Sequence, residues 1–569
     1  MNIQAKASEA KHSRHMSLLA MALVSGAALH FEVLLTRHIA IEHWHHLIPV
    51  VIAIALLGFG IAGSLATVLF CFIRCHYPRL LLFCALAMMF SFPLSQWLAH
   101  KVPLNMLALP WYPYQYAYLV LYALCWLAPF FLAGLYITAN FMRWPKSIAK
   151  LYGADLIGGA FGAISAFALL EFNQYAFSLI FSPLLAAMAV FILLHKPLAK
   201  AGAATAIAGI MLLGQQELLP GTEFNSFKAL SISQNETGAK LLWQHDSAHS
   251  RLSLLATPAQ HASPGMSINS SLTALPQWQL FIDGDPATPL LLTAQHQASK
   301  PYFTQSIYAA PYQLIAKPDK VLLTGTNPSW HSWIAYWHKA TSITLLDKDK
   351  HLPPLLKAIK SQANNWIKDS SVNIIAPSTK IIPKHPRRFI EASTEKFDLI
   401  MMAVGSNPVG STASKANYLM TQESLATAFN RLSDNGILAI SNHMSPLPRD
   451  NIRVLNTLIK LLKQKQLSPQ QHVVMVRDWR TLIFMLSKSP INYLQRQQIY
   501  RWCRQWHFDL AALPGLKRTE VNQYHIKPKA WYFDSFKALT GPESDQFVKQ
   551  FLFELSPSND NKPYIYHSF

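Results

Sequence analysis

The residues best suited to bind a nucleoside lie at the ends of two short apolar runs in the polar half of the chain. Gly325, Thr326 and Asn327 form the turn after the first run, and Asp347 ends the second. A carboxylate at the end of a second strand can accept hydrogen bonds from both ribose hydroxyls, while the preceding turn lies along the ligand. These four residues are therefore a candidate nucleoside site.

The turn lacks the glycines that such a site needs for close approach of the backbone. Residues 326–329 are Thr, Asn, Pro and Ser, so only Gly325 is suitable. A second polar loop, Val404–Ser411, follows a buried apolar run and adds Asn407 as a candidate ligand. Each candidate also has a structural interpretation: Asp347 as a helix cap or salt bridge, and Asn407-Pro408 as simple turn chemistry.

Short strands that alternate with helices must position these residues. This order predicts a parallel sheet with its ligand at the carboxyl ends of the strands. The predicted strands are Val321–Leu323, Ile343–Leu346, Phe397–Ala403 and Ile437–Ser441, and the predicted helices are Tyr302–Ala316, Trp330–His338 and Thr421–Leu432. Upstream, Leu241–Leu255 and Leu280–Leu292 are expected to form short strands, with a hairpin turn at Asp283-Gly284. We expect Asp349, His331 and His338 to be surface residues.

Composition divides the chain into an apolar and a polar half. Of 569 residues, 51% are hydrophobic and 14% are charged, which excludes a single ordinary soluble domain. The part before residue 215 holds 12 Lys/Arg and 5 Asp/Glu, leaving 37 and 24 for the remainder. Because these basic residues are dispersed, a solvated surface is favoured and no nucleic-acid partner is expected. The five cysteines form neither a disulfide framework nor a zinc spacing.

The apolar half contains segments of the length needed to cross a bilayer. Six predicted spans are Met16–Leu35, Leu47–Ile73, Leu80–Leu98, Tyr116–Phe141, Leu151–Leu170 and Ala176–Leu194, and a weaker seventh is Ala201–Leu213. Ten basic residues precede the first span or lie in loops on that side, whereas Arg37 and Lys101 lie in the alternate loops. This asymmetry predicts a cytoplasmic N-terminus. With seven spans the polar half faces outside, and with six it faces the cytoplasm.

Ionisable residues inside the spans are candidates for function. Glu32 and Asp155 would be costly there without a partner, so they indicate transport or a hydrogen bond between helices. His38, His43, His45 and His46 cluster in the first loop, where interfacial histidines are the favoured interpretation and no metal site is predicted.

Glycines in the spans have a packing interpretation. Gly58, Gly60 and Gly63 spell GxGxxG, but inside a span rather than after a soluble strand. We therefore expect these three, like Gly158 and Gly162, to allow close helix packing.

Ordered motifs along nearly the whole chain resemble those of bacterial multi-pass membrane proteins fused to a spermidine synthase-like domain. In the apolar half these are SGAALHFEVLLTRHIA, LLGFGIAG, PFFLAGLYITANF and KLYGADLIGGAFGAISA. In the polar half they are HDSAHSRLSLL, LFIDGDPATPL, YQLIAKPDKVLLTG, KFDLIMMAVGSNPVGS and YLMTQESLATAFNRLSDNGILAI. The tail adds VVMVRDWRTLIFMLSKSP, FDLAALPGL and SPSNDNKPYIYHSF.

The resemblance implies a helical transmembrane bundle of six or seven spans, followed by an α/β Rossmann-like methyltransferase-fold domain of seven strands with a small N-terminal β-subdomain. The expected boundaries are 1–214 for the bundle, 215–300 for the β-subdomain, 301–490 for the Rossmann-like domain and 491–569 for a cap. It implies S-adenosylmethionine or its decarboxylated form as the class of cofactor and a small amine as the second ligand, without identifying either.

The match departs from the family where its chemistry resides. The proton-accepting Asp of the catalytic loop corresponds to Val404, and the second Asp corresponds to Asn407. The acid that contacts adenine would fall near His385, and the amine-gripping Tyr-His-Glu run is Phe303-Thr304-Gln305. Since valine cannot accept a proton, ordinary aminopropyl transfer is not expected.

Three functions remain open from the sequence. The first is a non-catalytic inner-membrane protein, in which the spermidine synthase-like domain is a ligand-binding or assembly module. The second is a transferase with altered chemistry, which uses a nucleoside cofactor to transfer an aminopropyl or methyl group. The third and weakest is transport by the membrane half. The lipid bilayer is the expected partner, and the oligomeric state is open.

Overall fold

The computed structural model describes residues 2–43, 47–194, 196–215, 224–258, 261–292, 296–315, 317–325, 327–347, 354–356, 359, 373–403, 417–445 and 448–563. The chain forms two compact units, which are described separately. The helical unit comprises residues 1–235, 241–254 and 281–286, and the sheet unit comprises 236–240, 255–280 and 287–569.

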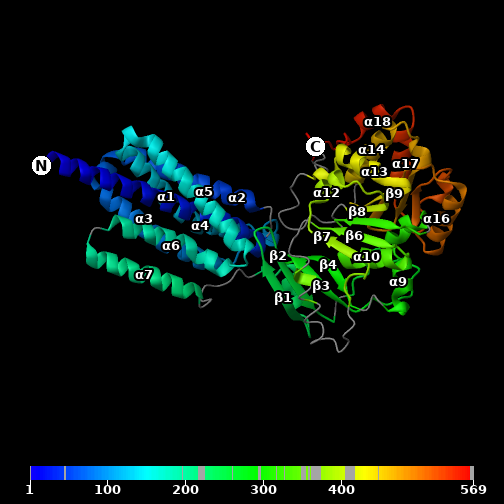
Figure 1. Ribbon diagram of the computed structural model, residues 1–569, viewed down its shortest axis with the longest axis horizontal. Helices are drawn as coiled ribbons and strands as arrows, with labels where there is room; N and C mark the ends of the chain where they lie inside the picture. Colours follow the sequence, from blue (N-terminus) through cyan, green and yellow to red (C-terminus); the bar gives the residue numbers. More distant parts are fainter. Residues whose placement is uncertain are drawn as a thin grey trace. The chain divides into compact units, whose positions relative to one another are not determined.

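The helical unit is a bundle of long apolar helices (Figure 1). They are α1 (Asn2–Glu42), α2 (Ile48–Val68), α3 (Phe70–Lys101), α4 (Tyr114–Arg143), α5 (Ile148–Glu171), α6 (Tyr175–Leu193) and α7 (Pro197–Gln215). Among the described residues, six helices are long and apolar enough to cross a membrane, from Met16–Glu42 of α1 to α6. This confirms the six predicted spans. The weaker seventh segment forms α7, which lies beside α6 and is not one of the six.

Glycines on α5 bring it into close contact with α1. A Cβ atom at Gly158 would lie 2.0 Å from the carbonyl oxygen of Ala22, and one at Gly162 would lie 2.0 Å from that of Gly26. Both partners advance by four residues, so the two helices run parallel. Close packing at these glycines is confirmed, because any side chain there would force the backbones apart.

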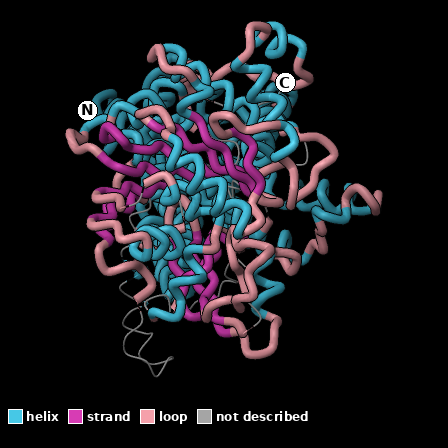
Figure 2. The backbone as a smooth tube through the Cα atoms, turned by 90° about the vertical axis from the view of Figure 1, so that its right-hand side faces the viewer, coloured by secondary structure: helices cyan, strands magenta, loops and turns pink. Residues whose placement is uncertain are grey.

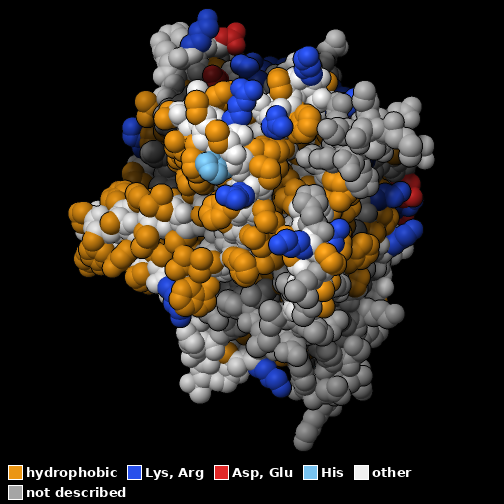
Figure 3. Space-filling view, turned by 90° about the vertical axis from the view of Figure 1, so that its left-hand side faces the viewer, with side chains coloured by type: hydrophobic (Ala, Val, Ile, Leu, Met, Phe, Trp, Pro, Cys, Tyr) orange, Lys and Arg blue, Asp and Glu red, His pale blue; other side chains and the backbone are white. Residues whose placement is uncertain are grey.

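The three glycines of the GxGxxG pattern on α2 do not behave alike. Gly58 contacts α4, where a Cβ atom would lie 2.8 Å from that of Phe130. Gly60 and Gly63 have no described atom within 4 Å of that position, so the packing prediction is wrong for them. Figure 3 looks onto the end of the helical unit, where hydrophobic side chains are prominent and Lys and Arg side chains lie among them.

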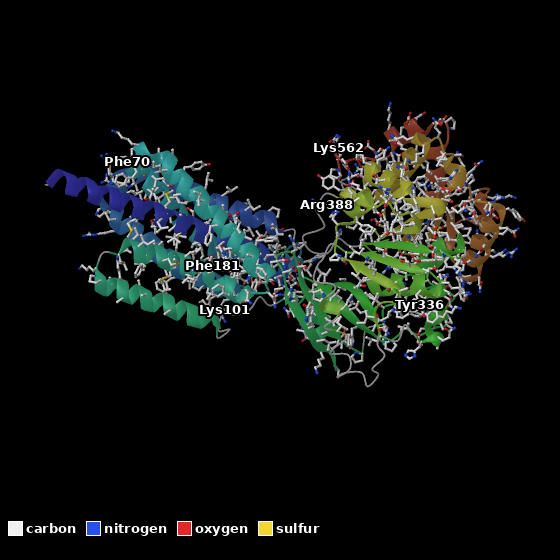
Figure 4. The ribbon with its side chains drawn as sticks, in the orientation of Figure 1. Phe70, Lys101, Phe181, Tyr336, Arg388 and Lys562 are labelled. Atoms are coloured by element: carbon white, nitrogen blue, oxygen red, sulfur yellow. The ribbon has the colours of Figure 1, made fainter. Side chains whose placement is uncertain are left out.

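The two ends of the bundle can be followed on α3. Phe70 starts this helix and Lys101 ends it, and the two side chains lie at opposite ends of the bundle (Figure 4). Phe70 lies at the end where α1 begins. The Tyr122 hydroxyl on α4 donates to the Glu42 carboxylate, so the start of α4 lies at the end where α1 stops.

A four-stranded antiparallel meander precedes the large sheet, with strands β1 (Lys240–Asp246), β2 (Arg251–Ala256), β3 (Gln277–Ile282) and β4 (Asp285–Leu291) in sequential order. The predicted hairpin turn is confirmed between β3 and β4. Asp283 and Gly284 have φ angles of 52° and 83°, the left-handed pair that a two-residue hairpin requires.

The sheet unit is built on eight strands in the order β12-β10-β11-β9-β8-β5-β6-β7. Their bounds are β5 (Lys320–Thr324), β6 (Ser342–Leu346), β7 (Thr379–Ile382), β8 (Phe397–Ala403), β9 (Leu432–His443), β10 (Val473–Arg477), β11 (Thr481–Ser487) and β12 (Asp509–Ala512). The neighbouring strands β7, β6, β5, β8 and β9 are mutually parallel, and β11 is antiparallel to β9. This doubly wound order agrees with the expected methyltransferase-type fold, with β12 as an eighth strand.

Helices cover the sheet (Figure 2). They include α10 (Pro328–Trp337), α12 (Pro386–Ala392), α13 (Gln422–Asn430), α14 (Arg449–Gln464), α16 (Tyr493–Gln505), α17 (Trp531–Thr540) and α18 (Ser544–Gln550). The helix predicted at 421–432 is confirmed as α13. The single helix predicted over 302–316 is wrong: α9 (Lys300–Thr304) and a 3₁₀ segment (Ile307–Gln313) replace it. Extended Ser306 separates them, and Pro311 lacks the N–H that an α-helix would use.

Candidate functional site

Several strands of the large sheet end at one edge, where an α/β fold binds its ligand. Thr324 at the end of β5 pairs with Leu346 of β6 and with Met402 of β8. Gly325 and Asp347 therefore follow neighbouring strand ends, as the sequence predicts. Their placement agrees with a nucleoside site, whereas their binding role stays a prediction.

Asp347 is half-buried at this edge. Its backbone N–H points at the carbonyl oxygen of Ile382 at 3.4 Å, which connects the ends of β6 and β7. Asp347 thus lies directly after β6, where the sequence predicts it, and its role in ribose binding stays a prediction.

Gly325 is required by the fold itself. Its φ of +64° lies in the left-handed region, and a Cβ atom there would be 2.5 Å from the carbonyl oxygen of Ala403. The loop after β5 thus passes directly against the end of β8. This close approach explains the glycine without any ligand.

The start of α10 is closed by its own side chains. The Asn327 side chain accepts the backbone N–H of Trp330 at 2.9 Å and donates to the Pro289 carbonyl at 3.3 Å. It is therefore an N-cap, which satisfies one of the free donors that a helix start would otherwise offer to an anionic group.

Two serines on α10 are also engaged in structural bonds. Ser329 donates to the Ile374 carbonyl at 2.7 Å and accepts the N–H of Leu291 at 3.0 Å. Ser332 donates to the Ser329 carbonyl and accepts the N–H of Ala376. These hydrogen bonds connect α10 to the neighbouring segments, so the two serine hydroxyls serve the fold.

The aromatic residues of α10 belong to the core. Trp330 and Trp333 are fully buried. Trp330 packs edge-on against Tyr302 and Phe303, with ring centroids 5.0 and 5.7 Å apart, and the Trp333 indole donates to the Ile374 carbonyl at 3.1 Å. Phe303 is itself fully buried against Trp330, so its side chain serves packing.

A group of titratable residues at the same edge was missed in the sequence. The turn between β10 and β11 holds Asp478, whose carboxylate accepts the N–H groups of Arg480 and Thr481 at 2.7 and 2.5 Å. Tyr308 contacts the ring of His331 at 4.7 Å and hydrogen-bonds to the Thr481 side chain. The only sequence signal was a charged turn between two apolar strands, Arg477–Arg480.

Burial controls the charge of this group. It lowers the pKa of His331 to about 4 and raises that of Tyr308 to about 12, so both side chains are neutral at pH 7. Burial also raises the pKa of Asp478, and it lowers that of His443 at the end of β9, with Arg480 adding to the second shift.

His331 in α10 and His338 directly after it differ from the surface positions expected for them. His331 is only 6% exposed, so that prediction is wrong. His338 is half-buried and stacks on Tyr312, with ring centroids 4.7 Å apart. Aromatic neighbours that are distant in sequence cover both rings.

Some predicted site residues lie outside the described residues. They are Thr326, Asp349 and the loop residues 404–416, which include Val404 and Asn407. The proposed roles of Thr326 and Asn407 in cofactor binding remain predictions, and so does the interpretation of Asp349 as a surface residue.

The two ionisable residues inside the spans do not form a pair. Asp155 on α5 accepts a hydrogen bond from the Ser25 hydroxyl on α1. Glu32 lies seven residues after Ser25 on α1, about 10 Å along the helix, and makes no hydrogen bond or ion pair with the described residues. The helix-to-helix hydrogen bond expected as one interpretation thus applies to Asp155.

The end of α1 carries a second polar cluster, within the helical unit. The Glu42 carboxylate accepts the Tyr122 hydroxyl at 3.1 Å and lies 3.2 Å from Nε2 of His38 and 4.0 Å from Nε2 of His43. Nδ1 of His38 lies 2.9 Å from the hydroxyl of Tyr175 at the start of α6. His45 and His46 lie outside the described residues, among which no three His, Cys, Asp or Glu side chains could hold a metal.

A buried ion pair and several hydrogen bonds fasten later residues of the helical unit to this end of α1. The Arg37 guanidinium donates to both carboxylate oxygens of Asp283, at 3.3 and 3.0 Å. The Lys228 ammonium donates to the carbonyls of Ala40 and Asp283, and burial lowers its pKa to about 8. The Asn225 N–H donates to the Glu42 carbonyl at 3.0 Å. The hairpin turn and residues 225–228 are thus joined to the end of α1.

Comparisons with known proteins find similarity only among solved structures: no family model and no curated protein matches the chain. Spermidine synthase from Thermotoga maritima is 14% identical, covering 52% of this chain and 87% of its own, with a TM-score of 0.32. A probable spermidine synthase from Corynebacterium glutamicum is 16% identical, covering 47% and 87%, with a TM-score of 0.32. A putative rRNA methylase from Clostridium thermocellum is 12% identical, covering 32% and 94%, with a TM-score of 0.23.

These values carry no argument about activity. The strand order itself shows an apolar helical region followed by an α/β domain with a doubly wound, largely parallel sheet.

Proposed function

We propose that this chain is an integral membrane protein whose sheet unit serves as a binding or assembly module and does not transfer aminopropyl groups. The observation that carries the proposal is the first turn of α10. Asn327 caps this turn and Ser329 bonds to neighbouring segments. Because Asn327 and Ser329 are used internally, they offer little to hold a cofactor.

The missing carboxylates support the same conclusion. Aminopropyl transfer needs a base to take a proton from the attacking amine, and a negatively charged site to attract a polycation. At the matching positions this sequence has Val404, Asn407 and the run Phe303–Gln305. None of these side chains carries a negative charge.

The proposal includes seven spans, a cytoplasmic N-terminus and a sheet unit outside the cytoplasm, in a bacterial inner membrane. Asn225 and Lys228 are held at the end of α1, the end at which α6 also begins. Since α6 runs away from this end, the chain must return along the bundle before residue 224. At 19 residues, α7 can rise about 28 Å, nearly the thickness of the hydrocarbon core.

The charge distribution supports this orientation. Arg37, one of the two basic residues on the side opposite the N-terminus, is buried against Asp283 and is not a loop charge. This leaves Lys101 against the ten basic residues of the other side. The positive-inside preference therefore favours a cytoplasmic N-terminus more strongly than the sequence count did.

Ligand titration tests the module. Full-length protein in nanodiscs is titrated by calorimetry with S-adenosylmethionine, its decarboxylated form and methylthioadenosine, and no saturable binding is expected. Saturable binding that Asp347→Ala abolishes would favour the second candidate, a transferase with altered chemistry. The observation in its favour is the half-buried Asp347 at the end of β6.

Reporter fusions test the topology. A reporter active only outside the cytoplasm and one active only inside are fused in turn after residue 235. The outside reporter is expected to be active. Activity of the inside reporter would mean six spans and would keep a cytoplasmic transferase as the leading alternative.

A further inference from the structure

His43 is the least satisfied polar side chain at the end of α1. Its side chain is 3% exposed, and neither ring nitrogen has a hydrogen-bond partner among the described residues. The ring of Tyr122 packs edge-on against it, with centroids 5.3 Å apart. A buried donor or acceptor without a partner costs about 1–3 kcal/mol, so such a group calls for a second state in which it is satisfied.

The geometry supplies that second state. Nε2 of His43 lies 4.0 Å from the Glu42 carboxylate, about 1 Å beyond a charge-assisted hydrogen bond. A protonated ring would carry an N–H at each nitrogen, and a small movement would let one of them donate to Glu42. A neutral His43 ring would form a weaker hydrogen bond with the Glu42 carboxylate, because it carries no positive charge.

The charged and titratable groups around His43 come from three segments. Glu42 and His38 lie in α1, which ends directly before His43, and Tyr122 comes from α4. Lys228, which follows α7 in the chain, is the remaining cation that acts on His43. Lys228 in turn faces Asp283, Asp285, Arg37 and Arg251.

We propose that His43, together with Glu42 and His38, forms a proton-binding site at the end of α1, and that its occupancy controls how tightly residues 225–228 are held there. The ligand is a proton taken from the aqueous side onto an imidazole nitrogen of His43. No bond other than the new N–H forms or breaks covalently. This inference does not rest on the proposed function, because it concerns the helical unit alone.

Proton uptake would weaken the hold of Lys228. The Lys228 ammonium is positioned by the carbonyls of Ala40 and Asp283, and a new cation on His43 would repel it. Movement of His43 toward Glu42 would also disturb the last turn of α1, whose Glu42 carbonyl accepts the N–H of Asn225. Acid is therefore expected to loosen residues 225–228.

The sign of the pH effect follows from the protonation states. Burial holds the pKa of His43 below its ordinary value, with Glu42 opposing this shift and His38 and Lys228 adding to it. The unfolded chain then binds more protons than the folded one just below the ordinary value of about 6.5. Above that pH the stability of this region does not depend on proton binding by His43. As the pH falls below it, the region becomes less stable.

Amide hydrogen exchange tests the proposal on the full chain in nanodiscs. Protection of the peptide that covers residues 224–235, corrected for intrinsic exchange, is measured at pH 7.5 and pH 5.5. Because one proton changes an opening constant by at most about tenfold per pH unit, a loss of roughly three- to tenfold is expected in acid. His43→Phe, which keeps an aromatic ring but takes no proton, should remove this loss.

The matched control is His76→Phe, an exposed histidine on α3, which should respond to pH as the unaltered chain does. If His43→Phe does not assemble, Glu42→Gln replaces it. This variant should move the transition to lower pH, because the carboxylate that favours the protonated ring is gone. The proposal is overturned if the unaltered chain shows no acid response, or if neither variant changes it.

Discussion

The start of α10 and the end of α1 both bury polar side chains, but they satisfy them differently. At the start of α10, Asn327, Ser329 and Ser332 each have a structural partner within hydrogen-bond distance. At the end of α1, Glu42 is bonded, whereas both ring nitrogens of buried His43 lack a hydrogen bond among the described residues. The indole nitrogen of Trp330 and Nε2 of His331 also lack a partner among the described residues, so the two regions differ in degree: His43 lacks a hydrogen bond at both ring nitrogens.

This difference shows where function can be sought. The resemblance directs attention to the sheet unit, yet Asn327, Ser329 and Ser332 at the start of α10 serve capping and packing. A fold can keep the strand ends of a nucleotide site after its ligand groups have been redirected to structure. Buried polar groups without a hydrogen bond are rare in native proteins. The end of α1 is therefore the stronger indication of a second state.

Removal of Asp283 should have the largest effect. Asp283→Ala leaves Arg37 buried without its carboxylate and removes the acceptor of the Arg251 N–H. Breaking such a buried pair costs about 3–5 kcal/mol, so the helical unit should fail to accumulate or should unfold at a much lower temperature. Unfolding in detergent is followed by tryptophan fluorescence, with Asp434→Ala at a fully exposed site as control. Equal melting of the two variants would mean that the ion pairs do not hold this end of α1 together.

Substitution of Gly325 should have the next largest effect. Gly325→Ala forces a side chain into a left-handed conformation and against the Ala403 carbonyl, at an expected cost of about 1–3 kcal/mol. The loss is predicted without any ligand present, because the glycine serves the fold. Gly60→Ala, at a position with open space, is the control and should melt like the parent. If Gly325→Ala lowers ligand affinity but not stability, the glycine belongs to a binding site instead.

Removal of the α10 cap should cost less. Asn327→Ala removes the acceptor of the Trp330 N–H, a loss of about 1 kcal/mol for a typical N-cap. Asn327→Asp can still cap the helix and should remain within a few tenths of a kcal/mol of the parent. The two variants are compared by thermal unfolding. Similar losses in both would show that stability depends on the hydrogen bond that the Asn327 side-chain amide donates to the Pro289 carbonyl, rather than on the cap.

Local sequence patterns predicted much of this architecture. Apolar length predicted the six spans, and alternation of strands with helices predicted the parallel part of the sheet. The hairpin at Asp283-Gly284 followed from turn chemistry alone. These features depend on neighbours in sequence, so a single chain is enough to identify them.

Features that depend on distant residues were not predictable in this way. Arg37 and Asp283 are separated by 246 positions, and nothing local to either one indicates the pairing. His331 is buried by contacts such as that with Tyr308, which lies before β5 and is therefore not a sequence neighbour. The cap at Asn327 is different: an Asn followed by Pro328 is a typical helix start, and this signal was available.

Asp347 offers the smallest expected effect and the sharpest test of the sheet unit. Asp347→Ala should change the free energy of unfolding by less than about 0.5 kcal/mol, because the residue is half-buried and lies just after the end of β6. A binding or assembly module that does not use the nucleoside position should also restore the phenotype of a deletion strain as well as the parent does. Asp398→Ala is the comparison, since that carboxylate accepts the N–H groups of Asp319 and Lys320 and its loss should be measurable as instability. An Asp347 variant that folds normally yet restores nothing would place a ligand at the carboxyl edge, and the contrast between the two regions would then be one between two working sites.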